Sequence, residues 1–240
     1  MRIPLDVEIR TPIWATGLLV ALMMTRSVGA ATSPAATVTG IPLDAPWKVK
    51  IYEIAHEGFV HPAWGWQHSE RDYRMALRIA RDEHLKVDTD ALFAAAFLHD
   101  MAAFRPCADK RIRHGECAAL QSPAILERVG FPMQKSAIVQ QAERGHMYYS
   151  DPGQDPTAIA LHDADSLDFL GDIGAARMLS LTGAKAPSFA PAVSALRGFL
   201  TAIPPRLITR TARRIAHRRV AELRAFLDTL QRETYDGRAM

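Results

Sequence analysis

The fold of this protein is decided by residues 91–100, which read ALFAAAFLHD. Eight apolar residues in succession leave no polar face, and this is typical of a helix buried on all sides. Asp88 or Asp90 can cap its start. The helix ends at His99 and Asp100, whose imidazole and carboxylate are costly to bury without a partner. A divalent cation binds both groups and is such a partner, whereas a solvent-exposed helix end is the alternative for the pair alone.

Helical periodicity continues on both sides of this stretch, and no β-type alternation persists. Gly130 and Pro132 end one helix, and Pro156 begins another in its first turn. Four prolines predict an irregular chain between residues 182 and 205. The sequence therefore predicts an all-α fold, an irregular bundle of crossing helices. The expected helices are 49–55, 73–84, 91–101, 116–129, 134–144, 156–170 with a continuation towards 181, and 206–234.

Length and composition fit one globular domain. The chain has 240 residues, of which 48% are hydrophobic and 23% charged, so a sizeable core can form. We assign the domain to residues 47–235 and a short tail to residues 236–240. The net charge of only +3 argues against binding of a nucleic-acid polymer, although the pI is near 9.0.

The first thirty residues resemble an export signal. Arg2 and Arg10 precede an apolar run over residues 13–24, and small residues follow up to a cleavage site near Ala30. We therefore expect residues 1–30 to be a signal peptide, and the mature protein to be periplasmic without stable membrane insertion. An uncleaved signal anchor is the alternative, although the run is short for a span of ~20 residues. Residues 31–46, rich in Ala, Thr, Pro and Gly, are predicted to be a linker.

Two cysteines, Cys107 and Cys117, are too few for a thiolate zinc site. In an oxidising compartment they can form a disulfide that closes a short loop. Two unpaired thiols are the equally weighted alternative.

Three separated motifs give a more specific indication. His68 lies about thirty residues before the His99-Asp100 pair, and residues 164–167 read Ala-Asp-Ser-Leu late in the chain. This order resembles the HD superfamily of metal-dependent phosphohydrolases, and the resemblance extends over residues 47–233. It implies an all-α bundle in which His68, His99, Asp100 and Asp165 hold one divalent cation. Mn, Fe, Co, Ni and Zn all suit such ligands.

The resemblance favours Asp165 over Asp163 as the late ligand. The two side chains point ~160° apart on a helix, so one ion cannot easily take both. We assign Asp163 as an alternative ligand, or as an acceptor of a hydrogen bond from a ligand histidine. Asp168 and Asp172 are interpreted as part of a solvated face.

Further residues are candidates for contact with a substrate. His114 and His146 fall in blocks where relatives carry histidines, so they are candidate ligands of a second metal or of substrate phosphate, with exposed loop histidines as the alternative. Arg71 lies one helical turn after His68 and is the candidate phosphate partner. Lys110 belongs to a basic loop after the His-Asp pair and is a weaker one.

The resemblance implies hydrolysis of a phosphomonoester, phosphodiester or nucleotide phosphoanhydride by metal-activated water, with Asp100, Arg71 and His114 as catalytic residues. The partner is then a small phosphorylated molecule, with nucleotides among the candidates. An HD-type di-iron oxygenase and a non-catalytic metal-containing binding protein are the alternatives. The sequence departs from the family at one point that weakens the interpretation as a nucleotidase. Residues 101–104 lack the acid that some HD nucleotidases carry there. Glu116 and Asp109 are the acids nearest to replace it.

Overall fold

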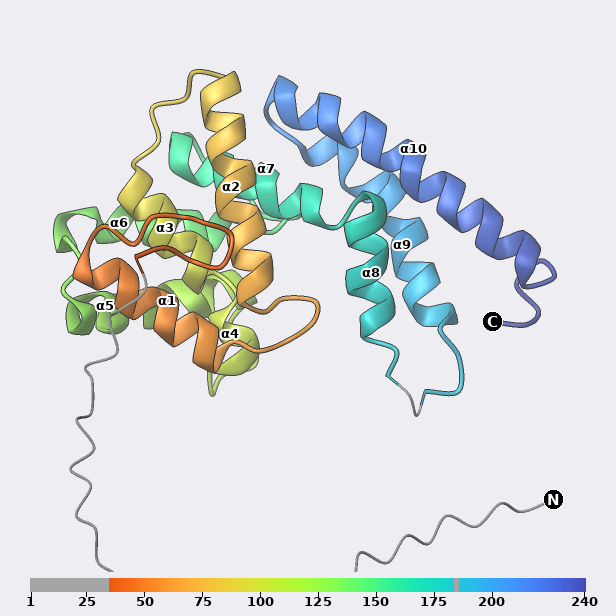
Figure 1. Cartoon of the computed structure of the whole chain (residues 1–240), viewed down its shortest axis with the longest axis horizontal. Helices are drawn as coiled ribbons and strands as arrows, with labels where there is room; N and C mark the ends of the chain where they lie inside the picture. The colour runs from red at the N-terminus through yellow and green to blue at the C-terminus, as the bar shows by residue number, and fades with distance from the viewer. Residues whose placement is uncertain (1–34, 184–185) are drawn as a thin grey trace, which may run out of the picture. The chain divides into compact units, whose positions relative to one another are not determined.

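A computed structural model describes residues 35–183 and 186–240. Backbone contacts divide the chain into residues 1–32 and 33–240, and every described element belongs to the second unit. The regular secondary structure in these described ranges is helical, with no β-strand, which confirms the all-α class (Figure 1). The helices are α1 Pro46–Gly58, α2 Trp66–Asp82, α3 Thr89–Leu98, α4 Met101–Phe104, α5 His114–Val129, α6 Ser136–Gly145, α7 Pro156–Asp168, α8 Gly171–Ser180, α9 Ala190–Ala202 and α10 Arg210–Glu233, with short 3₁₀ turns at Met133–Lys135 and Pro204–Arg206.

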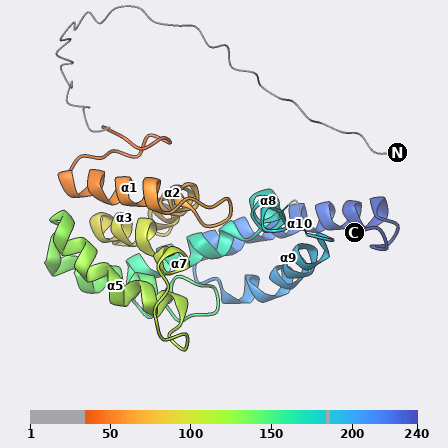
Figure 2. The ribbon, with the colours of Figure 1, turned by 90° about the horizontal axis from the view of Figure 1, so that it is seen from below.

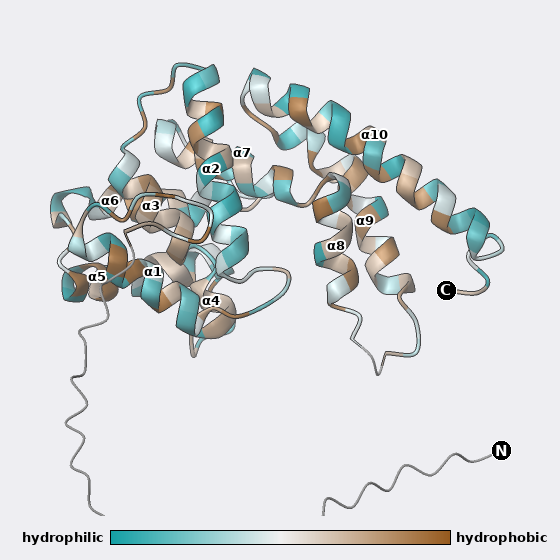
Figure 3. Cartoon of the chain, viewed as in Figure 1, coloured by the Kyte–Doolittle hydropathy of each residue, from teal (hydrophilic) through white to brown (hydrophobic). Residues whose placement is uncertain are grey.

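Helix α3 is the centre of the core. All residues from Ala91 to Leu98 are buried, as the apolar run predicts. The Asp88 carboxylate accepts hydrogen bonds from the backbone N–H groups of Asp90 and Ala91, so Asp88 is the cap of this helix. Figure 2 shows α3 between α1 and α5, and Figure 3 shows how hydrophobic α3 is compared with the largely hydrophilic α10. Because α3 ends inside the core, His99 follows it there and is fully buried.

Helix α7 and the chain after it differ from the sequence prediction. The predicted continuation towards residue 181 is wrong, because α7 ends at Asp168 and α8 begins at Gly171. Gly171 has φ of 73°, a left-handed conformation that a continuous α-helix does not contain. Helix α9 was not expected among the prolines of residues 182–205. Pro191 lies in its first turn, where a missing backbone N–H is tolerated, so this proline begins a helix instead of breaking one.

The chain before α1 is packed against the domain where the structure describes it. Within the range predicted to be a linker, Ile41 and Leu43 are buried in the core, and the backbone N–H of Thr39 donates to the buried Glu70 carboxylate on α2. The predicted signal peptide, residues 1–30, and residues 31–34 of the linker lie outside the described residues. Over residues 35–183 and 186–240, no helix combines the length and the apolar character needed to cross a bilayer.

Candidate metal centre

Three helices bring the chemistry-bearing residues together. His68 lies in the first turn of α2, which starts seven residues before the predicted helix, and Asp72 follows one turn later on the same face. His99 and Asp100 follow the C-terminal end of α3. Asp165 comes from α7, which packs against both α2 and α3. The structure therefore places the four residues predicted as ligands around one point and adds Asp72, which the sequence analysis did not identify.

The donor atoms have the spacing of a metal-ligand set. His68 Nε2 lies 3.4 Å from His99 Nε2 and 3.2 Å from Asp165 Oδ1. Asp100 Oδ2 lies 3.5 Å from His68 Nε2 and 3.4 Å from His99 Nε2. Asp72 Oδ2 lies 3.1 Å from His68 Nε2. Ligand atoms bound at ~2.0–2.2 Å to one ion are separated by roughly 3–3.6 Å, so the set fits a divalent cation.

The carboxylates of this cluster lack ordinary partners. Asp72 and Asp165 are almost completely buried, yet neither oxygen of Asp72 nor Oδ2 of Asp165 forms a hydrogen bond. A buried polar atom without a partner is destabilising by several kcal/mol in an apolar medium, on the order of 2–7. A cation in contact with these oxygens removes that penalty, so the residues present fit a metal ion.

The electrostatics of the cluster also favour positive charge. Burial opposes protonation of His99, but the charges of Asp100, Asp72 and Asp165 outweigh it and raise the pKa of His99 to about 10. Burial likewise opposes protonation of His68, and the nearby carboxylates raise its pKa to about 8. Burial is the main cause that raises the pKa of Asp72 to about 7. In the metal-free protein, protonated His99 and His68 therefore carry positive charge that stabilises the nearby carboxylates.

A second group lies on the other side of Asp100. His114, the first residue of α5, places Nε2 at 2.7 Å from Asp100 Oδ1. His146, directly after α6, places Nε2 at 3.8 Å from the same oxygen, and this nitrogen is buried without a hydrogen-bond partner. Burial and the charge of His99 lower the pKa of His146 to about 4, so its imidazole is neutral. His99, Asp100 and His146 together form a second set of atoms with metal-ligand spacing.

Asp168 orients the ring of His68, contrary to the prediction that it belongs to a solvated face. Its side chain is only 5% exposed, and Oδ2 lies 2.8 Å from His68 Nδ1. Burial opposes ionisation of Asp168, but hydrogen bonds from His68 and Arg71 hold its pKa far below the usual range. A carboxylate on Nδ1 directs Nε2 towards the metal position. Asp172 is exposed, as predicted.

The two arginines near His68 have different surroundings. Arg71 donates from Nε and Nη2 to Asp168 and does not line the cavity beside the cluster, so it is not the phosphate partner that its sequence position suggested. Arg177 of α8 is 2% exposed, donates to Asp168 and to the Ala63 carbonyl, and places Nη2 at 3.2 Å from His68 Nε2. Its position in an ordinary amphipathic segment gave no signal in the sequence.

Asp163 binds backbone N–H groups, and not the ligand histidine proposed from the sequence. Its carboxylate accepts hydrogen bonds from the backbone N–H groups of Ile208 and Thr209 at 2.9 and 2.8 Å. It therefore receives no hydrogen bond from a ligand histidine, because it points to the opposite side of α7 from Asp165. Burial raises the pKa of Asp163.

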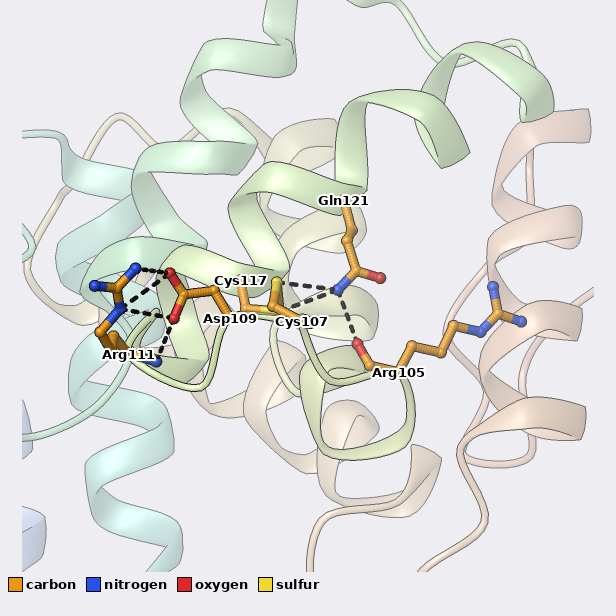
Figure 4. The surroundings of a disulfide bond; sticks show 6 residues. All are labelled: Arg105, Cys107, Asp109, Arg111, Cys117 and Gln121. Carbon is orange, nitrogen blue, oxygen red and sulfur yellow. Dashed lines mark hydrogen bonds and ion pairs between the residues drawn. A yellow bond between two sulfur atoms is a disulfide. The ribbon is translucent and has the colours of Figure 1, made fainter.

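The loop between α4 and α5 is covalently tied to α5. Cys107 and Cys117 form a disulfide, which decides the alternative that the sequence left open. Figure 4 shows the Gln121 amide beside the sulfurs, where Nε2 also donates to the Arg105 carbonyl at 2.8 Å. Asp109 pairs with Arg111 in the same loop.

Residues 101–104 lack an acid, and Asp109 and Glu116 were the candidates to replace it. Neither of them points into the site. Asp109 is engaged with Arg111, and Glu116 forms an ion pair with Arg144 at 2.8 Å. Lys110 is exposed and does not line the cavity beside the cluster. That cavity has a volume of about 310 Å³ and is bordered by Asp100, His114, Asp165 and Arg177.

Comparisons with known proteins agree with this arrangement. No protein-family model matches the chain, and neither does any curated protein. Among solved structures, a predicted HD superfamily hydrolase from an uncultured Thermotogales bacterium is 27% identical, with a TM-score of 0.55 over 77% of this chain and 91% of that one. A HD-superfamily hydrolase from Bacillus thuringiensis is 21% identical, with a TM-score of 0.57 over 78% and 94%. YpgQ of Bacillus subtilis, in complex with ADP, is 20% identical, with a TM-score of 0.59 over 78% and 97%. The chain therefore has the fold of the HD superfamily hydrolases.

Proposed function

We propose that this protein is a metal-dependent phosphohydrolase that cleaves a phosphate ester or anhydride with water. The observation that carries the proposal is the convergence of His68, His99 and Asp165 with Asp72, with Asp100 beside both histidines, next to a cavity that Asp100 and Asp165 line. The complex of YpgQ with ADP supports a phosphorylated substrate, because the two proteins share a fold.

His68, His99, Asp100 and Asp165, with Asp72 beside them, would hold the cation. A divalent ion in such a site lowers the pKa of water and polarises a phosphoryl oxygen. The residues around it have separate tasks. Asp168 fixes the ring of His68 through Nδ1. Asp100 is held by His114 through Oδ1, so it can orient the attacking water.

The reaction needs a positive group near the phosphoryl oxygens and a route for the proton. Arg177 also pairs with Asp168, but unlike Arg71 it lines the cavity, so it takes the role proposed for Arg71 from the sequence. Water forms a bond to phosphorus, the P–O bond to the leaving group breaks, and the leaving oxygen takes a proton. His114 borders the cavity and is 27% exposed, so it is the group placed to transfer this proton.

The test is metal analysis of the purified protein together with a panel of phosphomonoesters, phosphodiesters and nucleotides. His99→Ala should lose both metal and turnover, because it removes a ligand from the centre of the set. His217→Ala is the matched control, since His217 is an exposed histidine on α10. Turnover retained in His99→Ala would refute the proposal, and full metal content with no activity on the panel would favour a binding protein.

An HD-type di-iron oxygenase is the second candidate. The observation in its favour is the second ligand set of His99, Asp100 and His146 next to the first. Two irons per chain and oxygen consumption during turnover would support it. One metal per chain, or hydrolysis without oxygen, would exclude it.

We further propose that the protein is exported to an oxidising compartment. The support is the disulfide between Cys107 and Cys117, since such bonds persist mainly outside the cytosol. The expected result is a periplasmic protein whose mass shows cleavage near Ala30. A full-length protein in the cytosolic fraction would contradict the proposal.

A further inference from the structure

The cavity next to the metal centre has two chemically different parts. Its polar end consists of Asp100, His114, Asp165 and Arg177. Most of the remaining wall is hydrophobic and is formed by Trp64, Met147, Tyr149, Phe169, Met178 and Leu181. These side chains come from the loop before α2, the segment between α6 and α7, the junction between α7 and α8, and the C-terminal end of α8. A concave wall of hydrophobic and aromatic side chains next to a few convergent polar groups is characteristic of a binding site for a small molecule with an apolar part.

Two aromatic rings of this wall are held in place. The Trp64 ring stacks on His61, with ring centroids 4.0 Å apart and planes at 13°. The backbone N–H of Trp64 faces His61 Nδ1 at 3.4 Å, which fixes the turn. The guanidinium of Arg177 covers the Phe169 ring at 4.5 Å from its centroid. A ligand that enters therefore meets rings that are already oriented, and little side-chain freedom is lost on binding.

Part of this wall is open to solvent. Tyr149 is 47% exposed and Leu181 is 42% exposed, and both belong to the few large hydrophobic side chains that the described residues leave exposed. Apolar surface beside a polar site is unfavourable in water and is covered favourably by an apolar part of a ligand.

The charges of the cavity set the size of the anionic part. Among the described residues that line it, Arg177 is the only arginine or lysine, and Asp168 already pairs with it. Lys110 and Arg111 do not border the cavity. The cavity therefore offers one arginine, shared with Asp168, beside the metal position, and a triphosphate tail would lack further cationic partners.

Building on the phosphohydrolase function proposed above, we propose that the substrate is a phosphate monoester of a compact aromatic or apolar alcohol. The phosphoryl group faces Asp100, His114 and Arg177, and the alcohol lies against the wall that contains Trp64, Tyr149 and Leu181. The volume of about 310 Å³ is at the lower end of the range for small-molecule sites, roughly 300–1,000 Å³, which favours a small alcohol over a whole nucleotide.

Binding of two non-hydrolysable phosphonates tests this inference. Phenylphosphonate and methylphosphonate share the anionic group and differ in the apolar part. Calorimetric titration of the protein, with the metal it contains on purification, should give at least about tenfold tighter binding of phenylphosphonate. In Trp64→Ala and Leu181→Ala the ratio should fall to about twofold. Tyr235→Ala should leave it unchanged, since Tyr235 is an aromatic residue that is 72% exposed and lies outside the cavity.

Turnover separates failure of this inference from failure of the proposed function. Hydrolysis of 2-phenylethyl phosphate should exceed that of ethyl phosphate by a similar factor in kcat/KM, because the two primary alcohols differ mainly in the phenyl group. Equal kcat/KM values with metal-dependent hydrolysis would overturn the substrate class and leave the phosphohydrolase function standing. Binding of neither phosphonate and no hydrolysis of either ester would overturn both.

Discussion

Replacing Asp168 by asparagine probes the network that holds His68. The substitution keeps the shape of the side chain and removes the negative charge that faces His68, Arg71 and Arg177. Arg177 is 2% exposed, so its guanidinium would remain buried without an anionic partner. Removing one partner of a buried ion pair lowers stability by about 3–5 kcal/mol. Arg71 contributes little to this loss, because its side chain is 34% exposed and its charge is screened by solvent.

We therefore expect Asp168→Asn to lower the free energy of unfolding of the metal-free protein by about 3 kcal/mol. Metal affinity should fall as well, by roughly 10–100-fold, because the ring of His68 loses the acceptor that orients it. Urea denaturation followed by circular dichroism measures the first effect, and competition with a chelating dye measures the second.

Two further variants make the result specific. Asp172→Asn changes an exposed aspartate a few residues further on, and its effect should stay within about 0.5 kcal/mol. Asp168→Asn combined with Arg177→Met should recover part of the lost stability, because no unpaired charge is then buried. A loss below about 1 kcal/mol in Asp168→Asn, or no recovery in the double variant, would refute the account of this network.

Three other predictions concern separate parts of the molecule. Asp165→Asn should abolish metal binding, whereas Asp163→Asn should retain the metal but lower the melting temperature; equal metal loss in both, measured by elemental analysis, would contradict the assignment of the two side chains. Burial of Asp88 opposes its ionisation, but its hydrogen bonds lower its pKa below 3.8, so its contribution to stability is present above that pH and is lost as the pH falls further. Acid unfolding of Asp88→Asn should therefore show a weaker pH dependence below about pH 4 than the wild type. Replacing Cys107 and Cys117 by serine should lower the free energy of unfolding by about 3 kcal/mol in urea, as expected for a loop of this length, and an unchanged midpoint would argue against the bond.

The fold was largely predictable because its central helix has an unambiguous pattern. The apolar run that ends at His99 identifies a buried helix without any tertiary information. Its capping residue, Asp88, is also recognisable from the sequence. Helix α9 was less accessible, because a proline predicts either a break or a first helical turn, and only packing decides between them.

Parts of the site depended on tertiary structure. Asp72 is one turn after His68, but α2 begins at Trp66 and its N-cap residue, Gly65, has no side chain to cap it. The helix was therefore expected to start later, and the two residues were not placed on one face. Asp168 was assigned to the surface because a single long helix was expected. The break at Gly171 turns α8 back so that Arg177 meets Asp168, and no local pattern contains that information.

The disulfide has a consequence for how the protein is produced. Asp100 lies shortly before Cys107, and His114 lies one helical turn before Cys117, so a single cross-link restrains both ends of the Asp100–His114 contact. The helices that carry His68 and Asp165 lie outside the segment that this bond closes. Protein made in a reducing host should therefore retain the metal ion but lose the Asp100–His114 geometry that orients the attacking water. Two batches of identical sequence would then differ in turnover according to the cell compartment in which each was folded.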